Sequence, residues 1–269
     1  ATPSGAFTPG LECAGVVEAI GPPRPGPAPG LAVGDRVAVL TRFGGYATHL
    51  NFDLRYAVPF PAGWSSAEAA AWPVQALTAW YGLVPLGDLR AGKRVLVHSA
   101  AGGVGLQALD MIAALGGRAI ATVGQPDKRE FLVARRGLDP AAVIVRDRRR
   151  FGAELDAALA ATGARGLDLV LDAERLAPEG RYLLFGAADF MVGGPRPGYP
   201  ALAWRWLRRP RLDPLAMISA NRSLMAFNLI WMWEAVERVP AAVAAIRALV
   251  TTAPLVGERL PFEQAPEAM

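Results

Sequence analysis

The sequence predicts an α/β protein that contains a doubly wound parallel sheet and a second, smaller β domain. Short apolar runs separated by Gly- and Pro-rich turns fill residues 10–61, and from residue 67 strand-like runs alternate with helix-like segments. A glycine-rich loop joins one of these strands to the helix that follows it. At about 150 residues per domain, 269 residues are enough for two domains.

The composition excludes several protein classes. Hydrophobic residues make up 52% of the chain and charged residues 19%, which excludes a disordered polyelectrolyte, a collagen and a coiled coil. The single cysteine, Cys13, excludes an internal disulfide framework and a zinc site made of several cysteines, so we expect a reducing, cytoplasmic location. Nucleic-acid binding usually needs clustered charge, so the net charge of +4 does not predict it.

The longest uncharged stretch, residues 69–87, reaches the length of a membrane span but contains Pro73 and Pro85. We interpret it as a buried helix flanked by turns. The sequence opens at Ala1 without a methionine and without a basic segment followed by an apolar one, so no signal peptide is expected.

Apolar periodicity and turn residues place the elements in order. The runs between residues 10 and 61 are typical of a small all-β unit. The later alternation of strands and helices indicates βαβ units in a parallel sheet. The expected helices span residues 67–84, 105–116 and 128–138, and the expected strands span residues 94–100, 118–124 and 141–146.

Two further strands, residues 167–173 and 181–187, are separated by only seven residues. A parallel crossover needs about a dozen residues or more. Either this pair is antiparallel, as in an edge hairpin, or a helix is missing from the sequence near residues 173–174. We favour the missing helix, because a strand in a βαβ series normally returns through one.

The segment from residue 94 to 124 carries the most informative motif. An apolar strand runs into Ala-Ala-Gly-Gly-Val-Gly and then into an amphipathic helix, and this context predicts a dinucleotide-binding loop. Glycines let the backbone approach a pyrophosphate, and the helix N-terminus offers unpaired N–H groups. Ala100 replaces the first glycine of the G-x-G-x-x-G pattern. The expected contact residues are Ala101, Gly102, Gly103 and Val104.

The end of the second strand predicts the choice of cofactor. A carboxylate there binds the ribose 2′-hydroxyl of NAD, but this strand ends at Gly124 without one. Lys128 follows within a turn and Arg146 ends the next strand, so we expect the two cations to converge where a 2′-phosphate would bind. We therefore expect NADPH rather than NADH. Asp127 argues against this choice, and a solvated surface residue is the alternative role for Lys128.

Several segments together resemble the medium-chain dehydrogenase/reductase superfamily, and within it the zinc-free quinone oxidoreductases. These segments are TPGLECAGVVEAIG, GDRVAVL, GGYATHL, EAAAWPVQALTAWYGL, HSAAGGVG and GLDLVLD. A later stretch, residues 185–234, is most similar to the vesicle amine transport protein branch of this group. The resemblance implies a GroES-like β-barrel domain at residues 1–72 with 252–269 returning to it, and a Rossmann domain at residues 73–251. It also implies a homodimer.

Zinc alcohol dehydrogenases carry Gly-His-Glu where this chain has Gly10, Leu11 and Glu12, so the metal ligand is replaced. His49 and His98 lack partners at metal-ligand spacing, and no metal is expected. Without a metal to polarise a carbonyl, alcohol oxidation lacks its electrophile. Reduction of a quinone or an activated C=C bond (an enone) needs less assistance, because the cofactor supplies the hydride.

The resemblance also suggests active-site residues. Tyr81 matches a tyrosine that lines the cleft near the nicotinamide, although a core position is the alternative. Thr78, one turn earlier, is expected to hydrogen-bond on the nicotinamide side. Phe185, Gly186 and Asn228 are expected to form walls of the cofactor channel.

Two other functions remain open. One is a trans-acting enoyl-thioester reductase of the polyketide or fatty-acid type with an acyl carrier as partner, for which Arg205, Arg208, Arg209 and Arg211 are candidate contacts. The other is an NADPH-binding, lipid- or membrane-associated protein with little catalysis, because residues 203–209 interleave aromatic and cationic side chains as membrane-surface anchors do.

Overall fold

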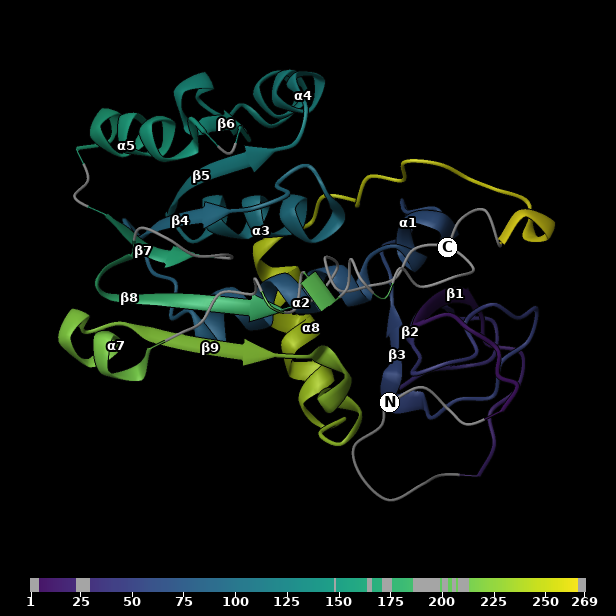
Figure 1. Cartoon of the computed structure of the whole chain (residues 1–269). Helices are drawn as coiled ribbons and strands as arrows, with labels where there is room; N and C mark the ends of the chain where they lie inside the picture. Colours follow the sequence, from purple (N-terminus) through teal and green to yellow (C-terminus); the bar gives the residue numbers. More distant parts are fainter. Residues whose placement is uncertain are drawn as a thin grey trace.

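The structure is a computed structural model of the 269-residue chain. It describes residues 5–22, 30–147, 149–163, 166–170, 176–185, 199, 203–204, 207 and 213–265. Two separate sheets organise these residues (Figure 1).

The smaller sheet is antiparallel, with β1 (Glu12–Val16), β2 (Arg36–Leu40) and β3 (Ala57–Pro59) in the order β1-β2-β3. Alternate residues of β2 point to opposite faces of the sheet. Val37 and Val39 pack in a small core of their own, whereas Ala38 and Leu40 join the main core of the molecule. The central strand of this sheet is therefore buried on both faces, and one face docks against the rest of the chain.

The larger sheet has six parallel strands in the order β6-β5-β4-β7-β8-β9. Numbered along the chain, this is the 3-2-1-4-5-6 order of a doubly wound nucleotide-binding sheet, so the predicted fold class is confirmed. The strands are β4 (Arg94–Val97), β5 (Arg118–Val123), β6 (Val143–Val145), β7 (Leu167–Val170), β8 (Leu176–Phe185) and β9 (Ser223–Phe227).

Helices cover both faces of the larger sheet. Val95 and Val97 of β4 pack into the main core with α3 (Gly103–Ala114), whereas Leu96 packs on the opposite face with α5 (Phe151–Ala161). This alternation explains why the inner strands are apolar throughout. The helices that follow β3 in the chain are α1 (Ser66–Ala70), α2 (Pro73–Tyr81), α3 (Gly103–Ala114), α4 (Pro126–Arg136), α5 (Phe151–Ala161), α7 (Pro214–Ala220) and α8 (Arg238–Leu249).

The helix expected at residues 67–84 is divided into three parts. A capping box formed by Ser65 and Glu68 begins α1, and Pro73 then begins α2 at its first position. A π-helical turn, η2 (Gly82–Leu86), follows α2 and contains Pro85. The division follows from the two prolines, each of which removes an N–H donor from the helix. The burial of α2 agrees with our interpretation of residues 69–87 as a buried helix. No helix in the described residues is long and apolar enough to cross a membrane.

The pairing of β7 with β8 excludes the antiparallel alternative for these two strands. The pair is parallel, with Leu169 opposite Arg181 and Val170 opposite Tyr182, so the antiparallel hairpin is wrong. The physical reason is that β8 lies inside the sheet between β7 and β9, where Tyr182 and Leu183 are buried on opposite faces. The connection at residues 171–175, including the expected missing helix, lies outside the described residues.

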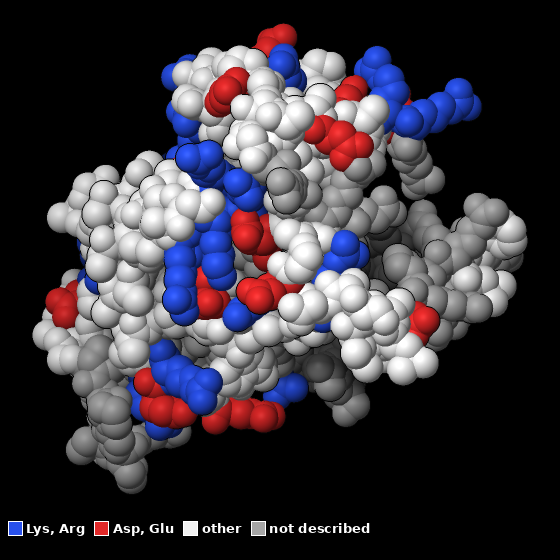
Figure 2. Space-filling view, turned by 90° about the vertical axis from the view of Figure 1, so that its left-hand side faces the viewer, with Lys and Arg blue, Asp and Glu red and all other residues white. Residues whose placement is uncertain are grey.

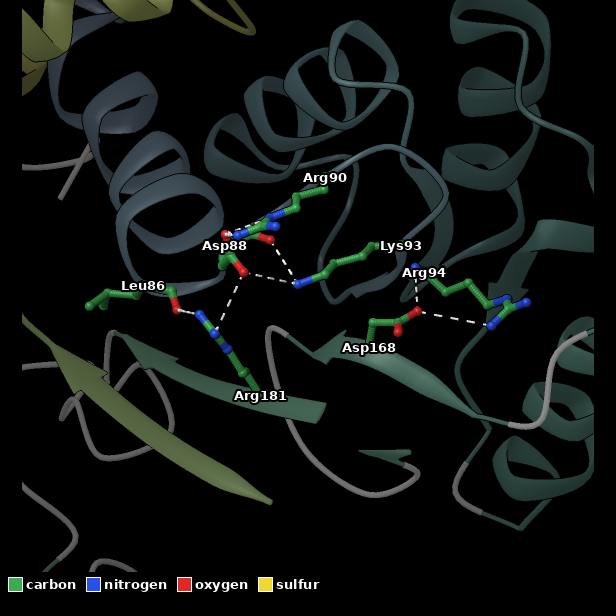
Figure 3. A network of polar contacts seen from close by, with 7 residues as sticks. All are labelled: Leu86, Asp88, Arg90, Lys93, Arg94, Asp168 and Arg181. Atoms are coloured by element: carbon green, nitrogen blue, oxygen red, sulfur yellow. Dashed lines mark hydrogen bonds and ion pairs between the residues drawn. The ribbon is translucent and has the colours of Figure 1, made fainter. Parts of the chain in front are cut away.

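Polar contacts join Lys93, just before β4, and Arg181 of β8 to the chain at the end of η2 (Figure 3). Arg181 of β8 donates from Nη1 to the Leu86 carbonyl at 2.8 Å and lies 3.7 Å from the Asp88 carboxylate. Lys93 Nζ donates to the Asp88 carbonyl at 2.8 Å, and the Arg94 backbone N–H donates to the Asp168 carboxylate at 2.8 Å.

Figure 2 shows the molecule from the left-hand side of Figure 1, where acidic side chains are interspersed among the basic ones. The carboxylates of Asp88 and Asp168 each lie within 4.0 Å of a cationic group. These two carboxylates are therefore paired within the fold, which favours a structural role for them.

Candidate cofactor site and active site

The strands of the larger sheet point toward the side on which β1–β3 lie (Figure 1). Ligands of doubly wound sheets bind at the carboxyl ends of the strands, where the strand order reverses. Here the reversal lies between β4 and β7. The glycine-rich loop leaves β4 at this point and leads directly into α3.

Close packing explains the last glycine of the loop. A Cβ atom on Gly105 would lie 2.6 Å from the Cα atom of Ala100 and 2.6 Å from the carbonyl oxygen of Ser99. No side chain fits at this distance, so the glycine lets the first turn of α3 pack against the loop. The Ala100 N–H in turn donates to the Thr122 carbonyl at 3.0 Å and ties the loop to β5.

The N-terminus of α3 is open to a ligand. Gly102 occupies the N-cap position with extended backbone (φ −83°, ψ 170°), and no side chain caps the helix. Its first N–H groups and the positive end of the helix dipole are the groups that bind a pyrophosphate. Gly102 is exposed, and Ala101, Gly103 and Val104 are partly exposed, so the structure brings the four predicted loop residues together at this helix end.

Gln75 of α2 is a neighbour of this loop that sequence reasoning missed. A Cβ atom on Gly103 would overlap the Gln75 side-chain amide, so the second helix lies directly against the loop. Gln75, Thr78 and Tyr81 recur at intervals of three along α2, which places them along one side of the helix. This spacing was the available signal, but it becomes informative only when the docking of α2 on the loop is known.

The two predicted cations lie at the end of β5. The Arg146 N–H donates to the Val123 carbonyl at 2.8 Å, which places Arg146 beside the tip of that strand and next to Gly124. Lys128 lies in the first turn of α4, directly after the same tip. Both side chains are exposed, and neither forms an ion pair with any residue in the described part of the chain. They are therefore available to an anion.

Tyr81 lies in an aromatic cluster at the carboxyl ends of β8 and β9. Its ring centroid is 5.2 Å from that of Phe227 and 5.2 Å from that of Trp231, and Phe185 lies 5.3 Å from Phe227. These edge and tilted contacts fix the plane of the tyrosine ring. The cluster unites the predicted residues Tyr81 and Phe185. Phe227 and Trp231 were not predicted, because they lie about 150 residues from Tyr81 in the sequence.

Two predicted polar residues have part of their hydrogen-bonding capacity used within the fold. The Thr78 hydroxyl donates to the Val74 carbonyl at 2.6 Å, so its oxygen can only accept from a ligand. The Asn228 side-chain oxygen accepts from the Ile230 N–H at 3.1 Å and caps η5 (Leu229–Trp233), which leaves its NH₂ group to donate. Gly186 lies outside the described residues.

Glu12 is a second functional candidate that we did not assign from the sequence. Its carboxylate accepts from the Val74 N–H at 2.8 Å and so joins β1 to the N-terminus of α2. Burial raises the pKa of Glu12 to about 7, against the lowering effect of the Val74 hydrogen bond. Cys13 beside it has its thiol pKa raised, first by burial and then by the Glu12 charge.

His98 directly follows the last residue of β4. Its Nδ1 atom lies 2.9 Å from the Thr122 hydroxyl, within hydrogen-bonding distance, and its ring lies 5.9 Å from that of Phe151. Within the described residues no three His, Cys, Asp or Glu side chains are grouped so as to hold a metal ion.

Of the segment at residues 203–209, the structure describes Ala203, Trp204 and Leu207, and the candidate carrier-binding arginines lie outside the described residues.

Comparisons with known proteins relate the chain to one group. No protein-family model matches it. The synaptic vesicle membrane protein VAT-1 homolog of Danio rerio is 31% identical over 254 residues, which covers 91% of this chain and 50% of that protein. A highly reducing polyketide synthase of Aspergillus terreus is 38% identical over 192 residues, covering 67% of this chain and 7% of the synthase. The chain thus spans about half the length of the first of these relatives and a small part of the second.

Solved structures show the same relationship. Human synaptic vesicle membrane protein VAT-1 homolog-like protein shares the fold with a TM-score of 0.77 at 24% identity, over 99% of this chain and 75% of that one. A quinone oxidoreductase from Thermus thermophilus, solved also with NADPH, has a TM-score of 0.69 at 28% identity, over 97% of this chain and 76% of that one. The chain is therefore similar to a group of proteins that contains the quinone oxidoreductases and the VAT-1 homologues, and these neighbours share its fold.

Proposed function

We propose that the chain is an NADPH-dependent, zinc-independent reductase that transfers a hydride to a quinone or to a C=C bond conjugated with a carbonyl group. The main support for this proposal is the N-terminus of α3. No side chain caps it, and Gly105 lets the glycine-rich loop pack closely against the helix, so the free N–H groups could bind a pyrophosphate. The NADPH bound to the Thermus thermophilus quinone oxidoreductase supports the same cofactor.

The residues at the tip of β5 support NADPH over NADH. A 2′-phosphate carries a charge of about −2, and Lys128 and Arg146 are two exposed cations without an ion-pair partner in the described residues. Gly124 at the tip of β5 is exposed, and a Cβ atom on it would meet nothing within 4 Å, which leaves room for the ribose. Asp127 also lies in the first turn of α4, where the two neighbouring cations would offset its charge against a phosphate.

The aromatic cluster and α2 would shape the reacting end of the site. The cofactor supplies a hydride from its nicotinamide, and the chain must position the acceptor and stabilise the oxygen on which negative charge develops. The Tyr81 ring is held by Phe227 and Trp231, so its hydroxyl is the preferred donor to that oxygen. The Thr78 oxygen is free to accept from an amide N–H, such as that of a carboxamide.

A trans-acting enoyl-thioester reductase is the second candidate. The 38% identity with a highly reducing polyketide synthase favours it, since enoyl reduction is also hydride addition to a conjugated C=C bond. The two candidates differ in whether the acceptor is a small free molecule or an acyl group on a carrier. The homodimer, the division at residues 72–73 and the cytoplasmic location remain predictions.

The test is to follow NADPH oxidation by the chain with three acceptors in parallel: a benzoquinone, a small enone and a crotonyl thioester. We expect turnover with at least one of the first two. Turnover of the thioester alone would favour the second candidate. Tight NADPH binding with no turnover of any acceptor would instead favour the non-catalytic, membrane-associated alternative, and vesicle flotation with Trp204→Ala would then test that alternative.

A further inference from the structure

A second site, separate from the glycine-rich loop, lies where α8 ends beside the loop that follows β3. It is a pocket of about 280 Å³ whose lining residues are Pro59, Phe60, Pro61, Trp64, Arg247, Val250 and Thr251. An apolar cavity of about 150 Å³ is large enough to admit benzene. This pocket therefore has room for a small organic molecule, and it shares no lining residue with the proposed NADPH site.

The aromatic side of the pocket is held in place by Arg36 of β2. Its guanidinium carbon lies 4.5 Å above the centroid of the Phe60 ring. Its Nη2 donates to the Trp64 carbonyl at 2.8 Å, and its Nη1 donates to the Ala62 carbonyl at 3.3 Å. Because one arginine fixes both aromatic residues, the pocket walls are organised before any ligand binds.

Arg247 is the one charged residue among the lining residues. It lies half-buried in the last turn of α8, and burial lowers the pKa of its guanidinium. No hydrogen bond or ion pair joins the Arg247 guanidinium to another residue in the described part of the chain. By contrast, the partly buried Arg136 is paired with Asp110 at 2.7 Å. Arg247 thus carries a partly desolvated charge that no described residue pairs.

We propose that this pocket binds a small carboxylate with an apolar body, whose carboxylate pairs with Arg247 while the body packs against Phe60 and Trp64. The planar guanidinium can donate two parallel hydrogen bonds to a carboxylate. A monoanion suits the pocket better than a phosphate dianion, because the lining residues supply a single positive charge among apolar side chains. The Thr251 hydroxyl is a further donor at the rim.

Calorimetric titration of the whole chain with octanoate and with octanol tests the proposal, since the two probes differ in the charged group and share the apolar body. Each probe is titrated into the wild type, Arg247→Met and the control Arg135→Met, which removes an exposed arginine from the end of α4. We expect Arg247→Met to weaken octanoate at least about tenfold and to leave octanol unchanged. The control should bind both probes like the wild type.

A photoreactive octanoate analogue locates the binding site by mass spectrometry. We expect crosslinks on peptides that contain Phe60, Trp64 or Val250. Equal octanoate affinity in Arg247→Met and the wild type, absence of octanoate binding to the wild type, or crosslinks confined to the Tyr81 cluster would each overturn the proposal. Because none of these readouts requires NADPH oxidation, failure here is distinct from failure of the proposed reductase function.

Discussion

Replacing Glu12 with glutamine should stabilise the protein at neutral and alkaline pH. Glu12 has its pKa raised by burial from 4.5 to about 7, a difference of 7 − 4.5 = 2.5 units. Below pH 4.5 the carboxyl group is protonated in the folded and the unfolded states. As the pH rises, the unfolded state releases its proton first, so the free energy of unfolding falls until the pH passes the folded pKa of about 7.

The size of the effect follows from the shift. At 1.36 kcal/mol per unit, the wild type should lose about 3 kcal/mol of stability from this group between pH 4.5 and pH 8. Glutamine keeps an oxygen that accepts from the Val74 N–H and carries no charge, so Glu12→Gln should not incur this loss.

Urea denaturation of both proteins across this pH range measures the difference. The exposed Glu130 of α4 provides the control, because Glu130→Gln removes a carboxylate from the surface of α4. The free-energy difference between Glu12→Gln and the wild type should grow with pH by about 3 kcal/mol. A difference that stays constant with pH, or that grows equally for Glu130→Gln, would refute the reasoning about Glu12 burial.

Three further predictions concern the proposed cofactor site. Lys128→Ala and Arg146→Ala should each weaken NADPH binding by about 1.5–3 kcal/mol, roughly 10- to 150-fold, and leave NADH nearly unchanged; equal effects on both cofactors in a fluorescence titration would contradict the 2′-phosphate assignment. Gly105→Ala should abolish tight NADPH binding and lower the Tm, because the new Cβ atom would lie 2.6 Å from Ala100 Cα, and a variant with wild-type affinity would disprove this. Tyr81→Phe should lower kcat and leave the Tm unchanged, since it removes the hydroxyl and keeps the ring contacts; an unchanged kcat would exclude the hydroxyl as the oxygen-facing donor.

Local sequence signals predicted the glycine-rich loop and the strands and helices around it. The change from a strand period to a helix period on either side of residues 100–105 fixed the position of the loop, and the cations after β5 and β6 followed from strand order. Pro73 was visible as well, but its effect was underestimated: we expected one helix where the proline begins a new one.

Contacts between distant segments were beyond the reach of sequence patterns. Glu12 meets the Val74 N–H across 62 positions, and Arg36 reaches Trp64 across 28. No periodicity encodes either pair, since both depend on how the small sheet docks on α2 and on the loop after β3. The same holds for β8, whose parallel pairing with β7 contradicts the hairpin that the short connection allowed.

The most direct test of the central claim is the transfer of deuterium from NADPH labelled at C4 of the nicotinamide to an enone acceptor, measured by mass spectrometry of the product. The account predicts a saturated ketone that carries one deuterium at the former β-carbon, formed at a rate that falls in Lys128→Ala at low cofactor concentration. A reduced product without deuterium, or NADPH bound by the wild type with no product from an enone or a quinone, would contradict it.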